Sequence, residues 1–101
     1  MVNTRILVWD KVALNNLKDI YDYLKAGNNL VYAKEVKDTI LKSTKELLAN
    51  PNLYEQDRFK SDNDGSFRDF EKFKYRVAYK ITEKQIRILR VRHASREPTD
   101  Y

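Results

Sequence analysis

The chain has 101 residues, of which 42% are hydrophobic and 35% charged, and its formal net charge is +5. This length predicts a single domain over residues 1–101, and the lack of cysteine excludes disulfides and thiolate metal sites. No window approaches the roughly 18 apolar residues of a membrane span, and no signal peptide is recognisable. We therefore expect a cytoplasmic protein with no membrane partner.

The first quarter of the chain predicts a strand followed by a helix. Residues 5–9 are apolar and partly β-branched, in a run too short for a helix. Asp10 suits an N-cap, and apolar residues then recur with a helical period until Gly27-Asn28-Asn29. The members of this apolar stripe are Ala13, Leu14, Leu17, Ile20, Tyr21 and Leu24.

A second amphipathic helix is predicted over about Leu30–Ala49. It ends at Asn50-Pro51-Asn52, because the residue before a proline is pushed out of the helical region. The side chains expected to face inward are Ala33, Val36, Ile40, Leu47 and Leu48. Two such helices joined by a short Gly-Asn-Asn turn indicate an antiparallel hairpin.

The rest of the chain predicts a polar loop and then three strands. Residues 61–66 are rich in oxygen ligands, but they lack the twelve-residue spacing and closing Glu of a calcium loop. We therefore expect neither a metal nor a cofactor. The strands are predicted at about Phe67–Phe73, Tyr75–Ile81 and Gln85–Arg92.

Strict alternation sorts the faces of these strands. In the second, Tyr75, Val77, Tyr79 and Ile81 share a face; in the third, Ile86, Ile88, Arg90 and Arg92 do so. The order of a strand, a helix hairpin and a three-stranded antiparallel meander indicates an α+β fold. We expect the helices to pack on one face of a small twisted sheet.

The positive charge is concentrated in the predicted strands. Residues 1–57 hold eight Lys or Arg against eight Asp or Glu, whereas residues 58–101 hold twelve against seven. This asymmetry favours a basic surface on the sheet that binds an anionic partner. The alternative is a solvated edge whose charges keep the protein soluble.

The candidate functional residues lie in and after the last two strands. The expected binding residues are Lys72, Arg76, Arg90, Arg92 and Arg96. If the chain cleaves phosphodiesters, Arg76 and Arg92 would hold the phosphate, while His93 or Tyr101 would transfer a proton.

Each of these roles has a structural alternative. Arg76 would pair with Glu71 or Asp69 instead of a ligand. His93 would donate a hydrogen bond to a backbone carbonyl at the end of its strand. Tyr101 would be a frayed terminal residue.

An ordered set of residues across nearly the whole chain resembles the RelE/ParE superfamily of toxins from type II toxin–antitoxin modules. The matching residues are Trp9, Ala13, Leu17-x-x-Ile20-x-x-Tyr23-Leu24, Leu48-x-x-Pro51, Tyr75-Arg76-Val77-x-Tyr79, Ile88–His93 and Arg96-Glu97. The resemblance implies a small growth inhibitor that a cognate antitoxin holds inactive. Higher-order assembly of the two proteins is left open.

The two branches of that superfamily imply different targets. The string His93-Ala94-Ser95-Arg96-Glu97 is similar to the ending of the ParE-like branch, which poisons DNA gyrase. Nucleases of the RelE-like branch tend to have an arginine where this chain has Ala94. The resemblance thus favours gyrase, with ribosome-dependent mRNA cleavage by Arg76, Arg92, His93 and Tyr101 as the alternative.

A third possibility is a non-toxic nucleic-acid-binding or adaptor module. Aromatic side chains on a sheet can stack on bases. The predicted strands carry Phe67, Phe70, Phe73, Tyr75 and Tyr79. Their alternation with charged residues also suits the packing of a core.

Overall fold

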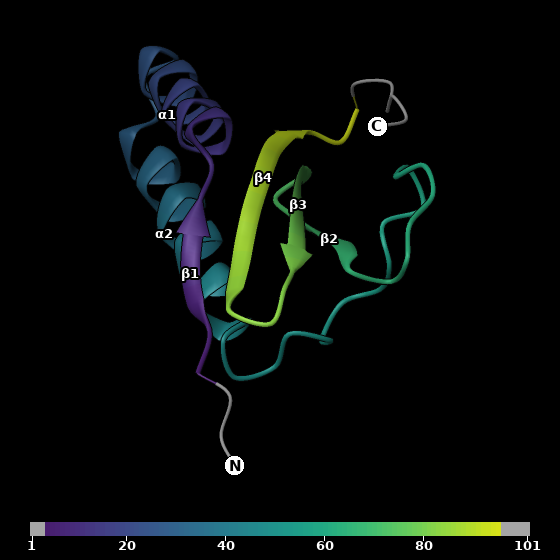
Figure 1. Cartoon of the computed structure of the whole chain (residues 1–101). Helices are drawn as coiled ribbons and strands as arrows, with labels where there is room; N and C mark the ends of the chain where they lie inside the picture. The colour runs from purple at the N-terminus through teal and green to yellow at the C-terminus, as the bar shows by residue number, and fades with distance from the viewer. Residues whose placement is uncertain (1–3, 96–101) are drawn as a thin grey trace.

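The computed structural model describes residues 4–95 and contains two helices packed on a four-stranded sheet (Figure 1). The elements in chain order are β1 (Ile6–Trp9), α1 (Lys11–Ala26), α2 (Leu30–Glu46), β2 (Phe67–Lys72), β3 (Tyr75–Ile81) and β4 (Gln85–His93). The predicted α+β order is confirmed. Neither of these helices is long and apolar enough to cross a membrane.

The sheet is mixed, with the strand order β1-β4-β3-β2. The N-terminal strand β1 runs parallel to β4, and β2, β3 and β4 form the predicted antiparallel meander. Because β1 pairs only with residues 85–88, the second half of β4 extends beyond the end of its parallel neighbour. Both helices cover the same face of the sheet (Figure 1).

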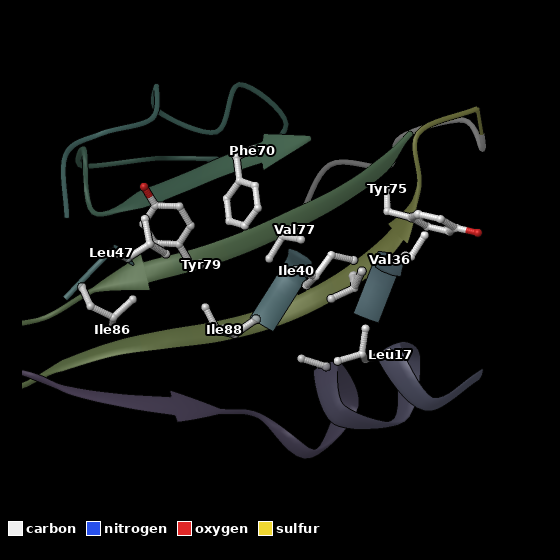
Figure 2. Close-up of a cluster of buried hydrophobic side chains, with 12 residues drawn as sticks. Leu17, Val36, Ile40, Leu47, Phe70, Tyr75, Val77, Tyr79, Ile86 and Ile88 are labelled. Carbon is white, nitrogen blue, oxygen red and sulfur yellow. The ribbon is translucent and has the colours of Figure 1, made fainter. Parts of the chain in front are cut away.

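The core lies between the helix hairpin and the sheet (Figure 2). Leu17 of α1 and Ile40 of α2 are buried against Val77 and Ile88 of the central strands. The predicted inward residues Val36 and Leu47 are also buried, and Ile20 and Leu24 pack partly buried against the same cluster. The predicted helix faces are therefore correct along most of their length.

Two expected core residues are exposed instead. Leu14 is 51% exposed because it lies at the shoulder of the apolar stripe of α1, away from the sheet. Leu48 is 40% exposed because α2 ends at Glu46, three residues earlier than predicted. The backbone N–H groups of Leu47 and Leu48 donate to carbonyls three residues back, so a tightened turn replaces the last predicted turn of α2.

The predicted N-cap of α1 has the right position but a different partner. Asp10 is the N-cap residue, yet its side chain makes no hydrogen bond to the first turn. Its carboxylate is paired with Arg87 of β4 instead. Asn29 caps α2 in the usual way, because its side-chain oxygen accepts from the Tyr32 N–H at 3.2 Å.

The faces predicted for the last strand are wrong because β4 contains a bulge. Ala78 pairs with Arg90 and Tyr79 pairs with Ile88, which leaves Leu89 as an extra residue. This extra residue reverses the alternation, so that Ile88 and Val91 both face the core. Arg90 consequently lies on the opposite face from Ile88, although strict alternation placed them together.

The connection from α2 to β2 passes round the far edge of the sheet (Figure 1). Gln56 forms an isolated antiparallel bridge with Arg68 of β2, and the Asp57 N–H donates to the Phe67 carbonyl at 2.8 Å. This segment thereby covers the first half of the β2 edge, which would otherwise present unpaired backbone groups. It also brings Phe59 against the face of the sheet that the helices leave open.

Candidate binding surfaces on the two faces of the sheet

Arg76 lies on the open face of the sheet, where it is paired with carboxylates of the same chain. Its guanidinium is 2.5 Å from the Asp69 carboxylate and 3.6 Å from that of Glu71. Burial raises the pKa of Asp69, and the hydrogen bond from Arg76 opposes that rise. The structural alternative for Arg76, an ion pair with Glu71 or Asp69, is therefore confirmed.

Arg92 and Arg90 join Arg76 on this open face. Arg92 is the cross-strand partner of Arg76, and Arg90 is the partner of Ala78. The guanidinium carbons of Arg76 and Arg92 lie 5.2 and 5.9 Å from the centre of the Phe59 ring. The predicted convergence of these three arginines is thus present, but an aromatic side chain of the chain itself lies against it.

His93 belongs to the other face of the sheet. Its ring lies edge-on to that of Tyr75, a core residue, with 5.2 Å between the ring centres. The Nδ1 atom of His93 accepts a hydrogen bond from the Ser95 N–H at 3.1 Å and lies 2.5 Å from the Ser95 hydroxyl oxygen. His93 therefore ends the strand by accepting from the backbone, not by donating to a carbonyl as the alternative supposed.

The predicted site residues are consequently divided between two surfaces. In the register of β2 and β3, Glu71 is the partner of Arg76 and Lys72 is the partner of Tyr75. Because successive side chains of a strand point to opposite faces, Lys72 lies on the face opposite the three arginines. Arg96 and Tyr101 lie outside the described residues. The catalytic and binding roles of all these residues stay predictions.

A groove of about 670 Å³ opens on the helix side, between α1 and the ends of β3 and β4. Four aromatic side chains line it, with Asp19 of α1 and the basic residues Lys74, Arg92 and His93. These aromatic residues are Tyr23, Tyr32, Phe73 and Tyr75. Tyr23 is 77% exposed, which is unusual for so large a side chain and leaves apolar surface open to a partner.

One wall of the groove is a tight turn with an unfavourable backbone. Phe73 and Lys74 connect β2 to β3 with φ angles of 52° and 66°, in the left-handed region that favours glycine or asparagine. The Phe73 ring meets Tyr32 edge-on at 5.8 Å, and the Lys74 carbonyl accepts from the Ala94 N–H at 2.6 Å. These contacts hold a turn whose two residues each cost about 1–2 kcal/mol in this conformation.

The edge of β4 next to the groove is partly capped by a side chain. The Asn16 side-chain oxygen accepts a hydrogen bond from the Val91 N–H at 3.0 Å. Asn16 thus satisfies one backbone donor where β1 no longer pairs with β4. It belongs to α1, so the helix and the sheet edge together form the floor of the groove.

Local sequence patterns do not reveal several of these residues. Tyr23 appears in the family resemblance only as part of a helix pattern, and Phe59 lies in a segment predicted as polar loop. Their placement depends on the path of residues 50–66 and on the bulge in β4. Over residues 4–95, no three His, Cys, Asp or Glu side chains are grouped to hold a metal ion.

Comparison with known protein families gives one match. The model of the ParE toxin of the type II toxin–antitoxin system, parDE, matches residues 7–98. The chain belongs to the ParE toxin family. No curated protein matches this ParE-family toxin.

Two solved structures are similar to this ParE-family toxin. The chromosomal ParDE toxin–antitoxin system from P. aeruginosa has a TM-score of 0.75 and 21% identity, over 93% of this chain and 100% of the other. The RelBE2 toxin–antitoxin complex from Mycobacterium tuberculosis has a TM-score of 0.61 and 16% identity, over 94% and 97% of the two chains. At these identities the likeness extends to the fold alone.

Proposed function

We propose that this ParE-family toxin inhibits growth by acting on DNA gyrase and does not cleave mRNA. The observation that supports the proposal is the separation of Arg76 and Arg92 from His93. The two guanidinium groups lie against Phe59 on the open face, whereas the imidazole lies against Tyr75 on the helix side. Groups on opposite faces of a sheet cannot clamp one phosphate and transfer a proton to it, so His93 is not placed to act with these two arginines.

The environment of Arg76 also argues against a nuclease. A phosphate-binding arginine needs a fork of N–H donors open to the ligand. In this chain the Arg76 fork is turned to Asp69 and Glu71, and the Asp69 side chain is only 10% exposed. Moving Arg76 to a phosphate would leave the buried Asp69 carboxylate without its guanidinium partner, at an energetic cost.

We also propose that a cognate antitoxin neutralises the toxin. Both similar structures are toxin–antitoxin systems, and the groove lined by Tyr23 and Phe73 offers apolar surface with Lys74 beside it. An antitoxin segment that folds on contact would place apolar side chains in the groove and acidic ones near Lys74. Its acidic residues are also expected to pair with some of Arg76, Arg90 and Arg92.

The target is tested by inducible expression in cells with separate readouts of DNA damage and protein synthesis. A gyrase poison induces the DNA-damage response and filamentation before translation falls. A ribosome-dependent nuclease stops amino-acid incorporation first. Early loss of translation, with mRNA cut inside ribosome-bound codons, would overturn the gyrase proposal in favour of the RelE-like alternative.

The antitoxin surface is tested with the protein encoded beside the toxin. Replacing Tyr23 or Phe73 by Ser should weaken the toxin–antitoxin complex, whereas Val31→Ser should not, because Val31 is 80% exposed and does not line the groove. Calorimetry at low and high salt measures both the affinity and the contribution of the basic residues. Equal affinities for the three variants would exclude the groove as the site.

A further inference from the structure

Two phenyl rings on the open face of the sheet are each surrounded by cations from separate segments. The guanidinium carbons of Arg58, Arg76 and Arg92 lie 5.3, 5.2 and 5.9 Å from the centre of the Phe59 ring. The ammonium groups of Lys60 and Lys80 lie 4.6 and 4.9 Å from the centre of the Phe67 ring. A loop and two strands therefore converge on one cationic surface, which we call the cationic face.

The two rings fix the positions of these long side chains. A cation over a phenyl face is held by the ring quadrupole, but the ring provides no compensating charge. The Phe67 ring thus helps to fix the positions of Lys60 and Lys80 before any ligand arrives. Because ordering a long side chain normally opposes binding, this arrangement favours an anionic ligand.

The register of the sheet extends the cationic face along β4. Arg87 of β4 is the cross-strand partner of Lys80. Further along β4, Arg90 is paired with Ala78 and Arg92 with Arg76. Two carboxylates on this side are covered, since Asp57 is buried and the Asp69 side chain is 10% exposed. Asp62 and Asp64 of the adjoining loop are exposed, and Asp64 lies near enough to Lys80 to interact with it. Glu71, with a side chain 49% exposed, lies beside Arg76, while Asp10 is paired with Arg87.

Cations of the chain cover both phenyl rings, and this favours a duplex over a single-stranded nucleic acid as the ligand. Proteins that bind single strands stack bases on open aromatic faces. Here the chain's own cations lie over Phe59 and Phe67, so the cationic face offers charge without a stacking platform. A duplex, whose bases are already stacked and whose phosphates form two regular rows, needs only charge. We infer that the cationic face binds the phosphate backbone of duplex DNA, independently of sequence and without gyrase. The phosphate contacts come from cations other than Arg76 and Arg87, which are paired with carboxylates of the chain.

The test measures the fluorescence anisotropy of a short labelled duplex as intact toxin is added, over a series of salt concentrations. We expect the logarithm of the binding constant to fall linearly with the logarithm of salt concentration. The double variant K60Q/K80Q should weaken binding by about tenfold or more at low salt. It should also make the slope of the logarithm of the binding constant against the logarithm of salt concentration shallower by about 2. This is about 1 for each phosphate that a lysine no longer neutralises.

The matched control is K34Q/K42Q, which removes two exposed lysines from α2 and gives the same net charge. It should leave the affinity within about twofold of the parent, since it changes only long-range charge. Arg58→Gln, at an exposed loop residue, is the second variant, so that a folding defect in K60Q/K80Q, detected by circular dichroism, leaves the test intact.

Four results would overturn the inference. They are no binding of duplex at low salt, equal losses in the two double variants, tighter binding of single-stranded RNA, and equal displacement of duplex by poly-glutamate of matched charge. The RNA result would also support the nuclease alternative. Because the assay contains no gyrase, a negative result would not bear on the proposal that the toxin acts on gyrase. The expression experiment tests that proposal separately.

Discussion

The hydroxyl of Tyr79 donates a 3.0 Å hydrogen bond to the carbonyl of Pro51. Tyr79 of β3 is fully buried in the core (Figure 2). Pro51 begins the segment that leads along the chain to Phe59. The bond therefore ties the core to the loop that builds the cationic face. Burial raises the pKa of Tyr79 to about 12, because a phenolate in the core would lose its hydration.

This raised pKa predicts a loss of stability in strong alkali. Above about pH 10 a tyrosine in the unfolded chain ionises, while folded Tyr79 keeps its proton to about pH 12. The unfolded state then binds fewer protons, so the free energy of unfolding falls as pH rises, by at most about 1.4 kcal/mol per pH unit from this residue. Urea denaturation of the parent and Tyr79→Phe across this window measures the difference. Parallel pH profiles would contradict the assignment.

The core between hairpin and sheet is tested at adjacent residues of α1. Leu17 is 6% exposed, so Leu17→Ala should lower the free energy of unfolding by ~2–5 kcal/mol. Lys18→Ala should change the free energy of unfolding far less, because its ion pair with Asp22 at 3.0 Å is exposed to solvent. Denaturant titrations of both proteins compare the two values. A larger loss at Lys18 would mean that the helix is rotated.

The pairing of Arg76 predicts a specific rescue. Arg76→Ala leaves the Asp69 carboxylate in its buried position without a guanidinium and should destabilise the fold by on the order of 3 kcal/mol. Adding Asp69→Asn removes the stranded charge and should recover part of that stability. Glu71→Gln is the control, since the exposed Glu71 contact at 3.6 Å should contribute little. If Arg76→Ala is as stable as the parent, the pair has no structural role.

The bulge at Leu89 predicts that one deletion is tolerated. Without Leu89, strict alternation again places Ile86, Ile88 and Val91 on the core face and the arginines on the other. Removing Arg87 instead would turn Ile88 toward the open face, place Leu89 on the core face and break the Arg87–Asp10 pair, so it should cost more stability than removing Leu89. Circular dichroism and thermal melting of the two deletion variants compare them. Equal damage from both would contradict the bulge.

The sequence predicted those elements whose residues carry a local signal. Helical periodicity placed Leu17 and Ile40 inward, and the Gly27-Asn28-Asn29 turn marked the end of α1, where Asn28 has a φ of 62°. Alternation placed Val77 and Tyr79 in the core. Local patterns of this kind depend only on neighbours along the chain, so they survive into the folded structure.

The features that the sequence could not predict arise from contacts between distant segments. A bulge carries no glycine or other marker at Leu89, so strict alternation assigned Arg90 and Arg92 to the wrong face. The Phe73-Lys74 turn has left-handed backbone angles without the residues that normally announce them. Phe59 reaches the arginines only because residues 54–57 pair with the edge of β2.

We propose that this toxin inhibits gyrase and is not a nuclease, a proposal supported by the position of Arg76 and Arg92 on the opposite face of the sheet from His93. The most direct measurement adds purified toxin to a gyrase supercoiling reaction and, separately, to a translation extract with labelled mRNA. The account predicts inhibited supercoiling with trapped DNA breaks, intact mRNA, and inhibition that persists in His93→Ala. Ribosome-dependent mRNA cleavage that disappears in Arg76→Ala/Asp69→Asn and in His93→Ala, with supercoiling unaffected, would contradict it.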